Sequence, residues 1–108
     1  MVRMNVVLVA SYPHARRLMQ ALRSLMIPTR LEPGCVTCSV WSDPDSTVRY
    51  IEEWATVPDM ERRVRSEAFT SLLGVIEGAE ERPEIRFDFH SATRGLDYVE
   101  ELRQPPPH

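Results

Sequence analysis

The chain of 108 residues contains no lysine, so all thirteen of its basic residues are arginines. These arginines are spread along the sequence, and the net charge is −3 at pH 7. Because a nucleic-acid-binding domain concentrates basic residues on one surface, we expect no nucleic-acid partner. The sequence also lacks the apolar run of roughly 20 residues that a membrane-spanning helix needs, and its first residues do not have the pattern of an export signal. We therefore expect a soluble, cytoplasmic protein without a membrane partner.

Cysteine is scarce as well, and the only two, Cys35 and Cys38, have the spacing of redox and zinc-binding CxxC motifs. They lie in a run, 35–42, that is typical of a β-strand, where residues three apart point to opposite faces. A redox motif needs its first thiol at a helix N-terminus, and a zinc site needs further ligands. Three histidines occur, none at a recognisable ligand spacing: His14, His90 and His108. We expect two reduced, buried thiols and no metal site.

A chain of this length can build one hydrophobic core but not two, which predicts a single domain. Apolar residues alternate or recur at helical spacing in segments separated by turn residues. The sequence predicts a strand over 4–10 and then a helix from 13 to about 26, which is stopped by Pro28. Two strands over 35–42 and 47–55 follow and are expected to form a hairpin. A helical region over 57–78 with a break near 65–66 and a strand over 85–90 complete the domain. The order β-α-β-β-α-β predicts an α+β fold, the ferredoxin-like split β-α-β with an antiparallel four-stranded sheet.

Two segments carry apolar residues that need cover beyond the predicted elements. The first predicted strand is apolar at nearly every position, with Asn5 as its only polar residue, so we expect it to be covered on both faces. The C-terminal extension, 92–108, carries apolar residues before three prolines, namely Leu96, Tyr98, Val99 and Leu102. We expect a short element there that packs across a partner subunit, followed by a disordered proline-rich end.

Three short stretches carry a resemblance to a known family. They are Arg30-Leu31-Glu32-Pro33-Gly34-Cys35, Glu52-Glu53-Trp54, and Ser66-Glu67-Ala68-Phe69 followed by Leu72-Leu73. In order and spacing they resemble the antibiotic biosynthesis monooxygenase (ABM) domain, which includes small quinol monooxygenases, over residues 4–91. The resemblance implies a homodimer in which two four-stranded sheets pack into a dimeric α/β barrel. That assembly would cover the second face of the first strand.

The ABM resemblance also implies a chemistry. Monooxygenases of this family need no metal, flavin or haem, because the electron-rich substrate itself reduces dioxygen once its hydroxyl is deprotonated. The implied function is the oxidation of a hydroquinone or polyketide-like phenol by dioxygen, with no cofactor. Haem degradation is excluded, since this chain has Arg62-Arg63 and Leu72-Leu73 where haem-degrading relatives carry a tryptophan and a histidine.

The candidate catalytic residues are Asn5, Glu52 and Arg63. On the second strand of the hairpin, Tyr50, Glu52 and Trp54 share one face. A carboxylate among aromatic residues either acts as a base or pairs with an arginine, and we expect the ion pair. Asn5 offers a hydrogen-bond donor for a substrate oxygen. Arg63 stands near the position where many family members have a histidine, and it can stabilise a phenolate but cannot act as a base at neutral pH.

Several of these positions also have plain structural explanations. We expect Pro33-Gly34 to set a turn, with Arg30 and Glu32 as an ion pair beside it. The candidate substrate-binding residues are Tyr50, Trp54 and Phe69. For the tryptophan and the phenylalanine, we expect first that they fill the core between helix and sheet, and a role as stacking surfaces for an aromatic substrate is the alternative.

Two other functions stay open at this level. The chain could be a non-catalytic dimeric protein that binds a small hydrophobic ligand, which the missing helix histidine favours. It could also be an isomerase or cyclase on the same fold, which needs acid and base groups and no oxygen.

Overall fold

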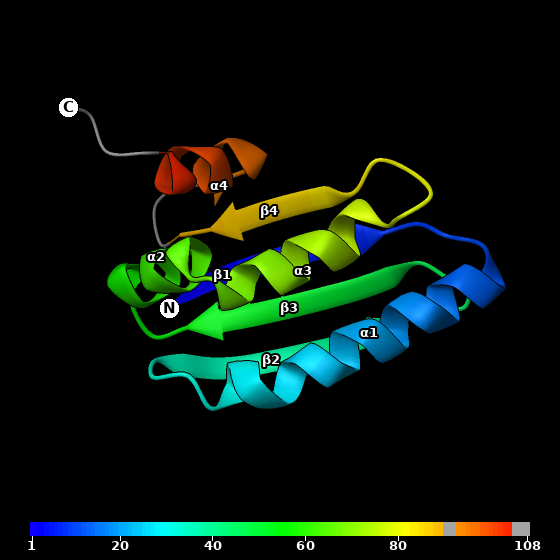
Figure 1. Ribbon diagram of the computed structural model, residues 1–108, viewed down its shortest axis with the longest axis horizontal. Coiled ribbons are helices and arrows are strands. Elements are labelled where there is room, and N and C mark those ends of the chain that lie inside the picture. The colour runs from blue at the N-terminus through cyan, green and yellow to red at the C-terminus, as the bar shows by residue number, and fades with distance from the viewer. Residues whose placement is uncertain (90–92, 105–108) are drawn as a thin grey trace.

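The computed structural model describes residues 1–89 and 93–104, which form one antiparallel sheet with helices packed on one face (Figure 1). The strands are β1 (Val2–Leu8), β2 (Cys35–Ser42), β3 (Val48–Trp54), β4 (Glu84–Asp88) and β5 (Thr93–Arg94), in the spatial order β2-β3-β1-β4-β5. The helices are α1 (Tyr12–Arg30), α2 (Val57–Arg65), α3 (Ala68–Glu77) and α4 (Leu96–Arg103). The predicted ferredoxin-like α+β fold is confirmed, with one short strand more than expected.

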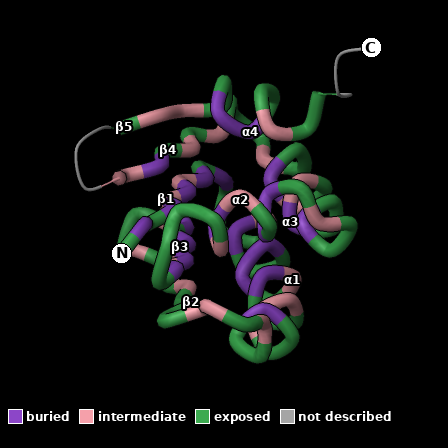
Figure 2. Tube along the Cα trace, turned by 90° about the vertical axis from the view of Figure 1, so that its left-hand side faces the viewer, coloured by how far each residue is buried: buried purple, intermediate pink, exposed green. Residues whose placement is uncertain are grey.

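The side chains of the strands alternate between a buried face and an open face of the sheet. The buried side chains of β1 are Val2, Met4, Val6 and Leu8. In the pairing of β1 with β3, Met4 lies opposite Glu52 and Val6 lies opposite Tyr50. Because opposite residues of an antiparallel pair point to the same side, the buried faces of the two strands coincide. Figure 2 shows the buried positions gathered between the sheet and the helices.

Helices α1 and α3 lie side by side over the buried face (Figures 1 and 2). Leu22 of α1 and Leu72 of α3 are both fully buried there. The two helices run in opposite directions in this view, so the C-terminal end of α1 lies near the N-terminal end of α3. This meeting point is where the polar groups of the candidate site converge.

Helix α1 is longer than predicted, because it continues past Pro28. Proline removes a main-chain donor and usually interrupts a helix. Here Thr29 is buried, and its hydroxyl donates to the carbonyl oxygen of Leu25 at 2.7 Å. The last turn closes through the N–H groups of Leu31 and Glu32, which donate to the carbonyl oxygens of Pro28 and Thr29. Tertiary packing of this turn outweighs the local preference of proline.

The helical region after β3 divides at the predicted place, between α2 and α3. The hydroxyl of Thr56 accepts a hydrogen bond from the N–H of Asp59 and begins α2. The hydroxyl of Ser66 accepts from the N–H of Phe69 and begins α3. The break places Arg63, near the end of α2, beside Phe69 of α3. The central carbon of the Arg63 guanidinium lies 5.3 Å from the centroid of the Phe69 ring.

The C-terminal extension forms α4, which packs on its own chain against α2 and β4. Tyr98 is buried there, with its ring 4.8 Å from the ring of Phe87. Arg103 donates to the carbonyl oxygens of Val64 and Ser66 at 2.7 and 3.1 Å. The apolar residues of this element are thus covered within the chain, and its packing across a partner subunit stays a prediction. A domain boundary at residues 91 and 92 stays a prediction.

The other face of the sheet carries no helix among residues 1–89 and 93–104, and the sheet is not closed into a barrel. Val7 and Ile51 are half-buried on this face, and Trp41 is 40% exposed. A second subunit covering β1, as the sequence predicts, stays a prediction.

No helix in the described ranges is long and apolar enough to cross a bilayer. The interpretations of His90, His108 and the prolines at 105–107 concern residues outside these ranges.

Candidate functional site

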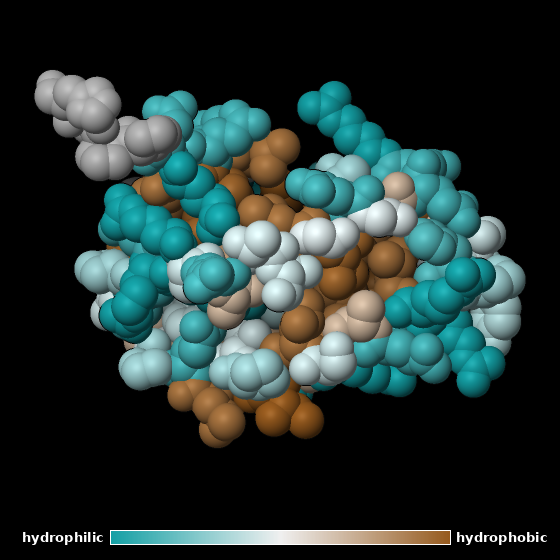
Figure 3. All heavy atoms as spheres, in the orientation of Figure 1, coloured by the Kyte–Doolittle hydropathy of each residue, from teal (hydrophilic) through white to brown (hydrophobic). Residues whose placement is uncertain are grey.

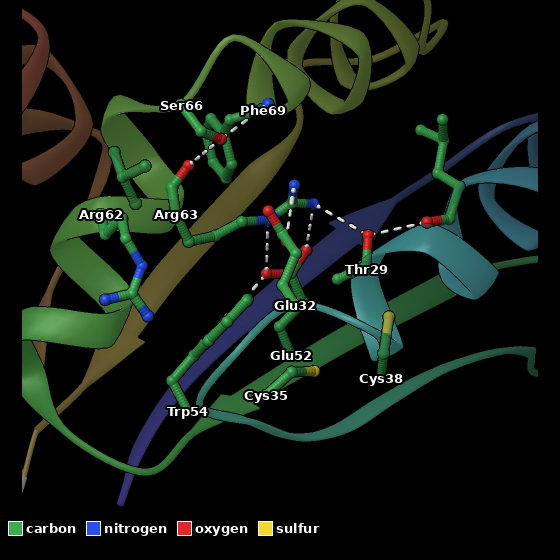
Figure 4. Close-up of polar contacts among 12 residues, drawn as sticks. Thr29, Glu32, Cys35, Cys38, Glu52, Trp54, Arg62, Arg63, Ser66 and Phe69 are labelled. Carbon is green, nitrogen blue, oxygen red and sulfur yellow. Dashed lines mark hydrogen bonds and ion pairs between the residues drawn. The ribbon is translucent and has the colours of Figure 1, made fainter.

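The centre of the candidate site is a buried ion pair between Glu52 of β3 and Arg63 of α2 (Figure 4). Glu52 is fully buried and Arg63 is 3% exposed. Arg63 Nε donates to Glu52 Oε1 at 3.0 Å, and Arg63 Nη2 donates to Oε2 at 2.8 Å. Two-point contacts between a guanidinium and a carboxylate are among the strongest hydrogen-bonded pairs in proteins. The predicted ion pair of Glu52 with an arginine is confirmed.

Two neighbours on β3 complete the hydrogen bonding of Glu52. The Tyr50 hydroxyl donates to Oε2 at 2.6 Å, and Trp54 Nε1 donates to Oε1 at 3.0 Å. Each carboxylate oxygen therefore accepts two hydrogen bonds. A carboxylate with four bound donors is poorly placed to accept a proton from a substrate. Through its two contacts with the guanidinium, Glu52 holds Arg63 in one orientation.

The negative charge of Glu52 also acts on the protonation of its neighbours. Burial raises the pKa of the Tyr50 hydroxyl, and the charge of Glu52 raises it further. Burial alone lowers the pKa of Arg63, but the hydrogen bonds and charge of Glu52 outweigh burial, so the pKa of Arg63 is raised. At neutral pH Tyr50 is a hydrogen-bond donor and Arg63 is a permanent positive charge.

The rest of the Arg63 guanidinium faces the C-terminal end of α1. Its Nη2 donates to the hydroxyl of Thr29 at 3.3 Å, and its Nη1 lies 3.5 Å from Glu32 Oε2. The carbon at the centre of the guanidinium lies over the Phe69 ring, in the range of a cation–π contact. These contacts, from elements far apart in the sequence, hold the group in place (Figure 4).

The turn after α1 places Glu32 beside Arg63. Gly34 has a φ of 87°, and a Cβ atom there would collide with the carboxyl group of Asp59, so the predicted Pro33-Gly34 turn is confirmed. The predicted ion pair of Glu32 with Arg30 is wrong. Arg30 instead donates to the carbonyl oxygen of Cys38 at 3.0 and 2.8 Å, and Glu32 is free to face Arg63.

A cavity of about 260 Å³ lies above Arg63, between α1 and α3. Its lining residues are Leu25, Pro28, Thr29, Glu32, Arg63, Ala68 and Ser71. The exposed members, Pro28, Ala68 and Ser71, form the mouth, and the buried members, Thr29 and Arg63, form the floor. Figure 3 shows apolar surface on the helix-covered side of the molecule, flanked by hydrophilic side chains. The cavity therefore offers apolar walls around a small polar floor.

The structure separates Asn5 from the other candidate catalytic residues. Asn5 lies opposite Ile51, so its side chain is on the open face of the sheet, away from Glu52. Its amide nitrogen donates to Asp88 Oδ2 at 2.9 Å. Asn5 and Trp54 therefore lie on opposite faces of the sheet, and a catalytic role for Asn5 stays a prediction. The first strand is apolar on both faces, so alternation alone did not show which way Asn5 points.

None of the three candidate substrate-binding residues belongs to the lining of the cavity. Tyr50 and Phe69 are fully buried and Trp54 is 1% exposed. As expected, the tryptophan and the phenylalanine fill the core between the helices and the sheet. Their contact with a ligand stays a prediction, since the cavity is lined by other residues.

Sequence reasoning missed Thr29 and gave Glu32 the wrong partner. A signal for Thr29 was available, because it continues the helical spacing of Leu18, Leu22 and Leu25 as a polar residue on an apolar stripe. Because the sequence predicts that the helix stops at Pro28, it does not indicate Thr29 as a residue of the site. No pattern in the sequence links Glu32 to Arg63, because tertiary packing alone brings them together.

The two cysteines lie on the same face of the sheet, which corrects the prediction. A β-bulge between Cys35 and Thr37 adds a residue, so Cys35 pairs with Trp54 and Cys38 with Glu52. Both thiols are free, and Cys35 is only half-buried. Cys38 Sγ lies 3.2 Å from the Tyr50 oxygen, whose hydrogen goes to Glu52, so the thiol is the donor. In the described ranges, no group of His, Cys, Asp and Glu could hold a metal ion.

Comparisons with known proteins bear on the fold. No protein-family model matches the chain, and no curated protein is similar to it in sequence. A candidate antibiotic biosynthesis monooxygenase from Deinococcus radiodurans is 23% identical with a TM-score of 0.73, over 85% of this chain and 94% of the other. One from Nitrosomonas europaea is 13% identical with a TM-score of 0.71, over 85% and 100%. A Pseudomonas aeruginosa protein is 25% identical with a TM-score of 0.67, over 84% and 94%. The chain therefore has the fold of antibiotic biosynthesis monooxygenases.

We expect the substitution Glu52→Gln to lower the free energy of unfolding by about 3–5 kcal/mol, because it leaves the buried charge of Arg63 without its main partner. Urea unfolding followed by circular dichroism measures this change. The matched control is Glu61→Gln, whose carboxylate faces Arg65 at 3.8 Å on the surface of α2 and should cost less than about 0.5 kcal/mol. Equal losses in the two variants would show that the buried pair has no special role.

We expect iodoacetamide at pH 8 to modify Cys35 at least about tenfold faster than Cys38 in the folded protein. Cys38 is 1% exposed, and burial raises the pKa of its thiol to about 11, so little reactive thiolate forms. Burial raises the pKa of Cys35 too, but this side chain is partly accessible. Mass spectrometry of digested protein measures both rates, and the unfolded chain in urea is the control, where they should converge. Equal rates in the folded protein would contradict the prediction.

Proposed function

We propose that this chain, which shares its fold with antibiotic biosynthesis monooxygenases, is a cofactor-independent monooxygenase that oxidises a hydroquinone or related phenol with dioxygen. The observation that carries the proposal is the single guanidinium of Arg63 on the floor of a cavity with apolar walls. A substrate hydroxyl that releases its proton to water at the mouth of the cavity leaves an oxyanion beside this fixed positive charge, which stabilises it.

The size of the cavity limits which substrates can bind. At about 260 Å³ it is below the usual range of roughly 300–1,000 Å³ for drug-sized ligands, but larger than the roughly 150 Å³ that holds benzene. A molecule with one aromatic ring fits this space better than a polyketide-like phenol with three. We therefore place a hydroquinone ahead of larger phenols.

The reaction needs no external reductant. One hydroquinone and one dioxygen balance to one hydroxyquinone and one water, since the substrate supplies all the electrons. The protein then only has to bind the substrate and stabilise its negative charge, and Arg63 and Glu52 are suited to these two tasks. Arg63 keeps its proton and acts on the substrate oxygen through charge and hydrogen bonds, while Glu52 holds it in orientation.

The second candidate is a non-catalytic protein that binds a small hydrophobic ligand. The observation that favours it is the saturation of Glu52 by four donors, which removes the base that the sequence suggested. Both candidates use the same cavity and differ only in turnover. An isomerase or cyclase, which needs an acid and a base, is the least supported of the three.

We also propose that the protein is a homodimer in which the open faces of two sheets pack together. The open face of the sheet is partly apolar, because Val7, Ile51 and Trp41 lie close to one another there in the strand register. Exposed apolar clusters of this kind on a sheet commonly mark an interface between subunits. Burying them gives β1 the two-sided cover that its composition predicts.

Oxygen uptake tests the proposed activity. Purified protein treated with a chelator should consume dioxygen with a simple hydroquinone faster than autoxidation. Ser71→Phe fills the mouth of the cavity without touching Glu52 or Arg63 and should lower the rate by about tenfold or more. The matched control is Glu77→Phe, an exposed position at the other end of α3, which should keep the rate. Uptake no faster than autoxidation would favour the binding protein.

Sedimentation velocity tests the proposed assembly. The protein at micromolar concentration should sediment as a dimer, and Ile51→Glu should shift it to monomer because a buried unpaired charge costs several kcal/mol. The matched control is Gln20→Glu, which adds the same charge at an exposed position of α1 and should leave the dimer intact. A wild-type protein that is monomeric under these conditions would overturn the proposed dimer.

A further inference from the structure

Glu32 has a buried carboxylate oxygen that makes no hydrogen bond. Its Oε2 atom is buried, yet it has no hydrogen-bond partner among the described residues. The closest charged group is Arg63 Nη1 at 3.5 Å, which forms an ion pair but no hydrogen bond with it. Leaving a buried acceptor unbonded is costly, so such an atom usually binds an ordered water or a ligand in the working protein. Oε2 belongs to a residue that lines the cavity.

Arg63 has unused donors at the same place. Its Nε donates to Glu52 and its Nη2 to Glu52 and Thr29, whereas its Nη1 makes no hydrogen bond with residues 1–89 or 93–104. The cavity floor therefore presents a donor and an acceptor next to each other. A hydroxyl group is the simplest ligand that satisfies both, because its oxygen accepts and its hydrogen donates.

We propose that Glu32 is a specificity-determining residue that accepts a hydrogen bond from the hydroxyl group of the ligand, while Arg63 Nη1 donates to the same hydroxyl oxygen. This inference rests on the proposed function for the location of the ligand. It goes beyond that function, because it assigns the choice of ligand to a residue of the turn after α1.

The charges beside the cavity favour a ligand that binds as a neutral hydroxyl over one that binds as a carboxylate. Of the side chains that line the cavity, Glu32 carries a negative charge and Arg63 a positive charge, so the two offset each other. A carboxylate ligand would meet Glu32 directly, with its oxygen against another carboxylate oxygen. A ligand hydroxyl, in contrast, relieves both the unbonded acceptor and the unused donor.

The test compares the affinities of hydroquinone, 1,4-dimethoxybenzene and benzoate, measured by calorimetry without dioxygen so that no turnover occurs. The dimethyl ether keeps the ring and the oxygens but has no hydrogen to donate. We expect the wild-type protein to prefer hydroquinone by about tenfold or more, and to bind benzoate most weakly. Glu32→Gln should lower the preference for hydroquinone over the ether by about tenfold and raise the affinity for benzoate. The matched control, Glu67→Gln, removes a charge from an exposed residue before α3 and should change neither ratio.

The outcomes separate this inference from the proposed function. A wild-type protein without preference for hydroquinone, or a Glu32→Gln protein that keeps it, would overturn the role of Glu32 whether or not the protein consumes dioxygen. Loss of the preference in Glu32→Gln would establish it, even if oxygen uptake stays at the rate of autoxidation. If Glu32→Gln fails to fold, the wild-type comparison of the three ligands decides alone.

Discussion

The buried pair of Glu52 and Arg63 is the interaction on which the rest of the site depends. A carboxylate taken out of water on the inner face of a sheet has to be matched by donors, and four are supplied by Tyr50, Trp54 and Arg63. Arg63 in turn ties α2 to the end of α1 through Thr29. One pair of opposite charges thus joins the sheet to two helices that are distant in the sequence.

The same pair explains why the charged guanidinium of Arg63 stays buried beside the cavity instead of turning outward into solvent. Arg63 has its buried edge bonded to Glu52 and its face on the ring of Phe69, so only Nη1 is left for a ligand or for Glu32. The cost of burying the charge is offset inside the core, away from the cavity. The position of the Nη1 donor beside the cavity is therefore determined by the core, which is the preorganisation that the proposed ligand site needs.

The parts of the site that were predictable are those that depend on local pattern. The shared face of Tyr50, Glu52 and Trp54 follows from the alternation of a strand, and the ion pair of Glu52 follows from the cost of burying a lone carboxylate. Asn5 shows the limit, because a strand that is apolar on both faces does not reveal its orientation. The cysteines show a second limit, since one extra residue in a β-bulge reverses the facing that regular alternation predicts.

By itself, the sequence determined the order of strands and helices from β1 to β4, the ferredoxin-like class, the break between α2 and α3, and the turn at Gly34. These depend on hydrophobic period, capping and backbone preference, which act over a few residues. Only the tertiary structure decided that α1 continues past Pro28, that Glu32 turns to Arg63 instead of Arg30, and that a cavity lies above them. Those outcomes depend on contacts between residues about 30 positions apart, whose energies exceed the local preferences and leave no periodic trace in the chain.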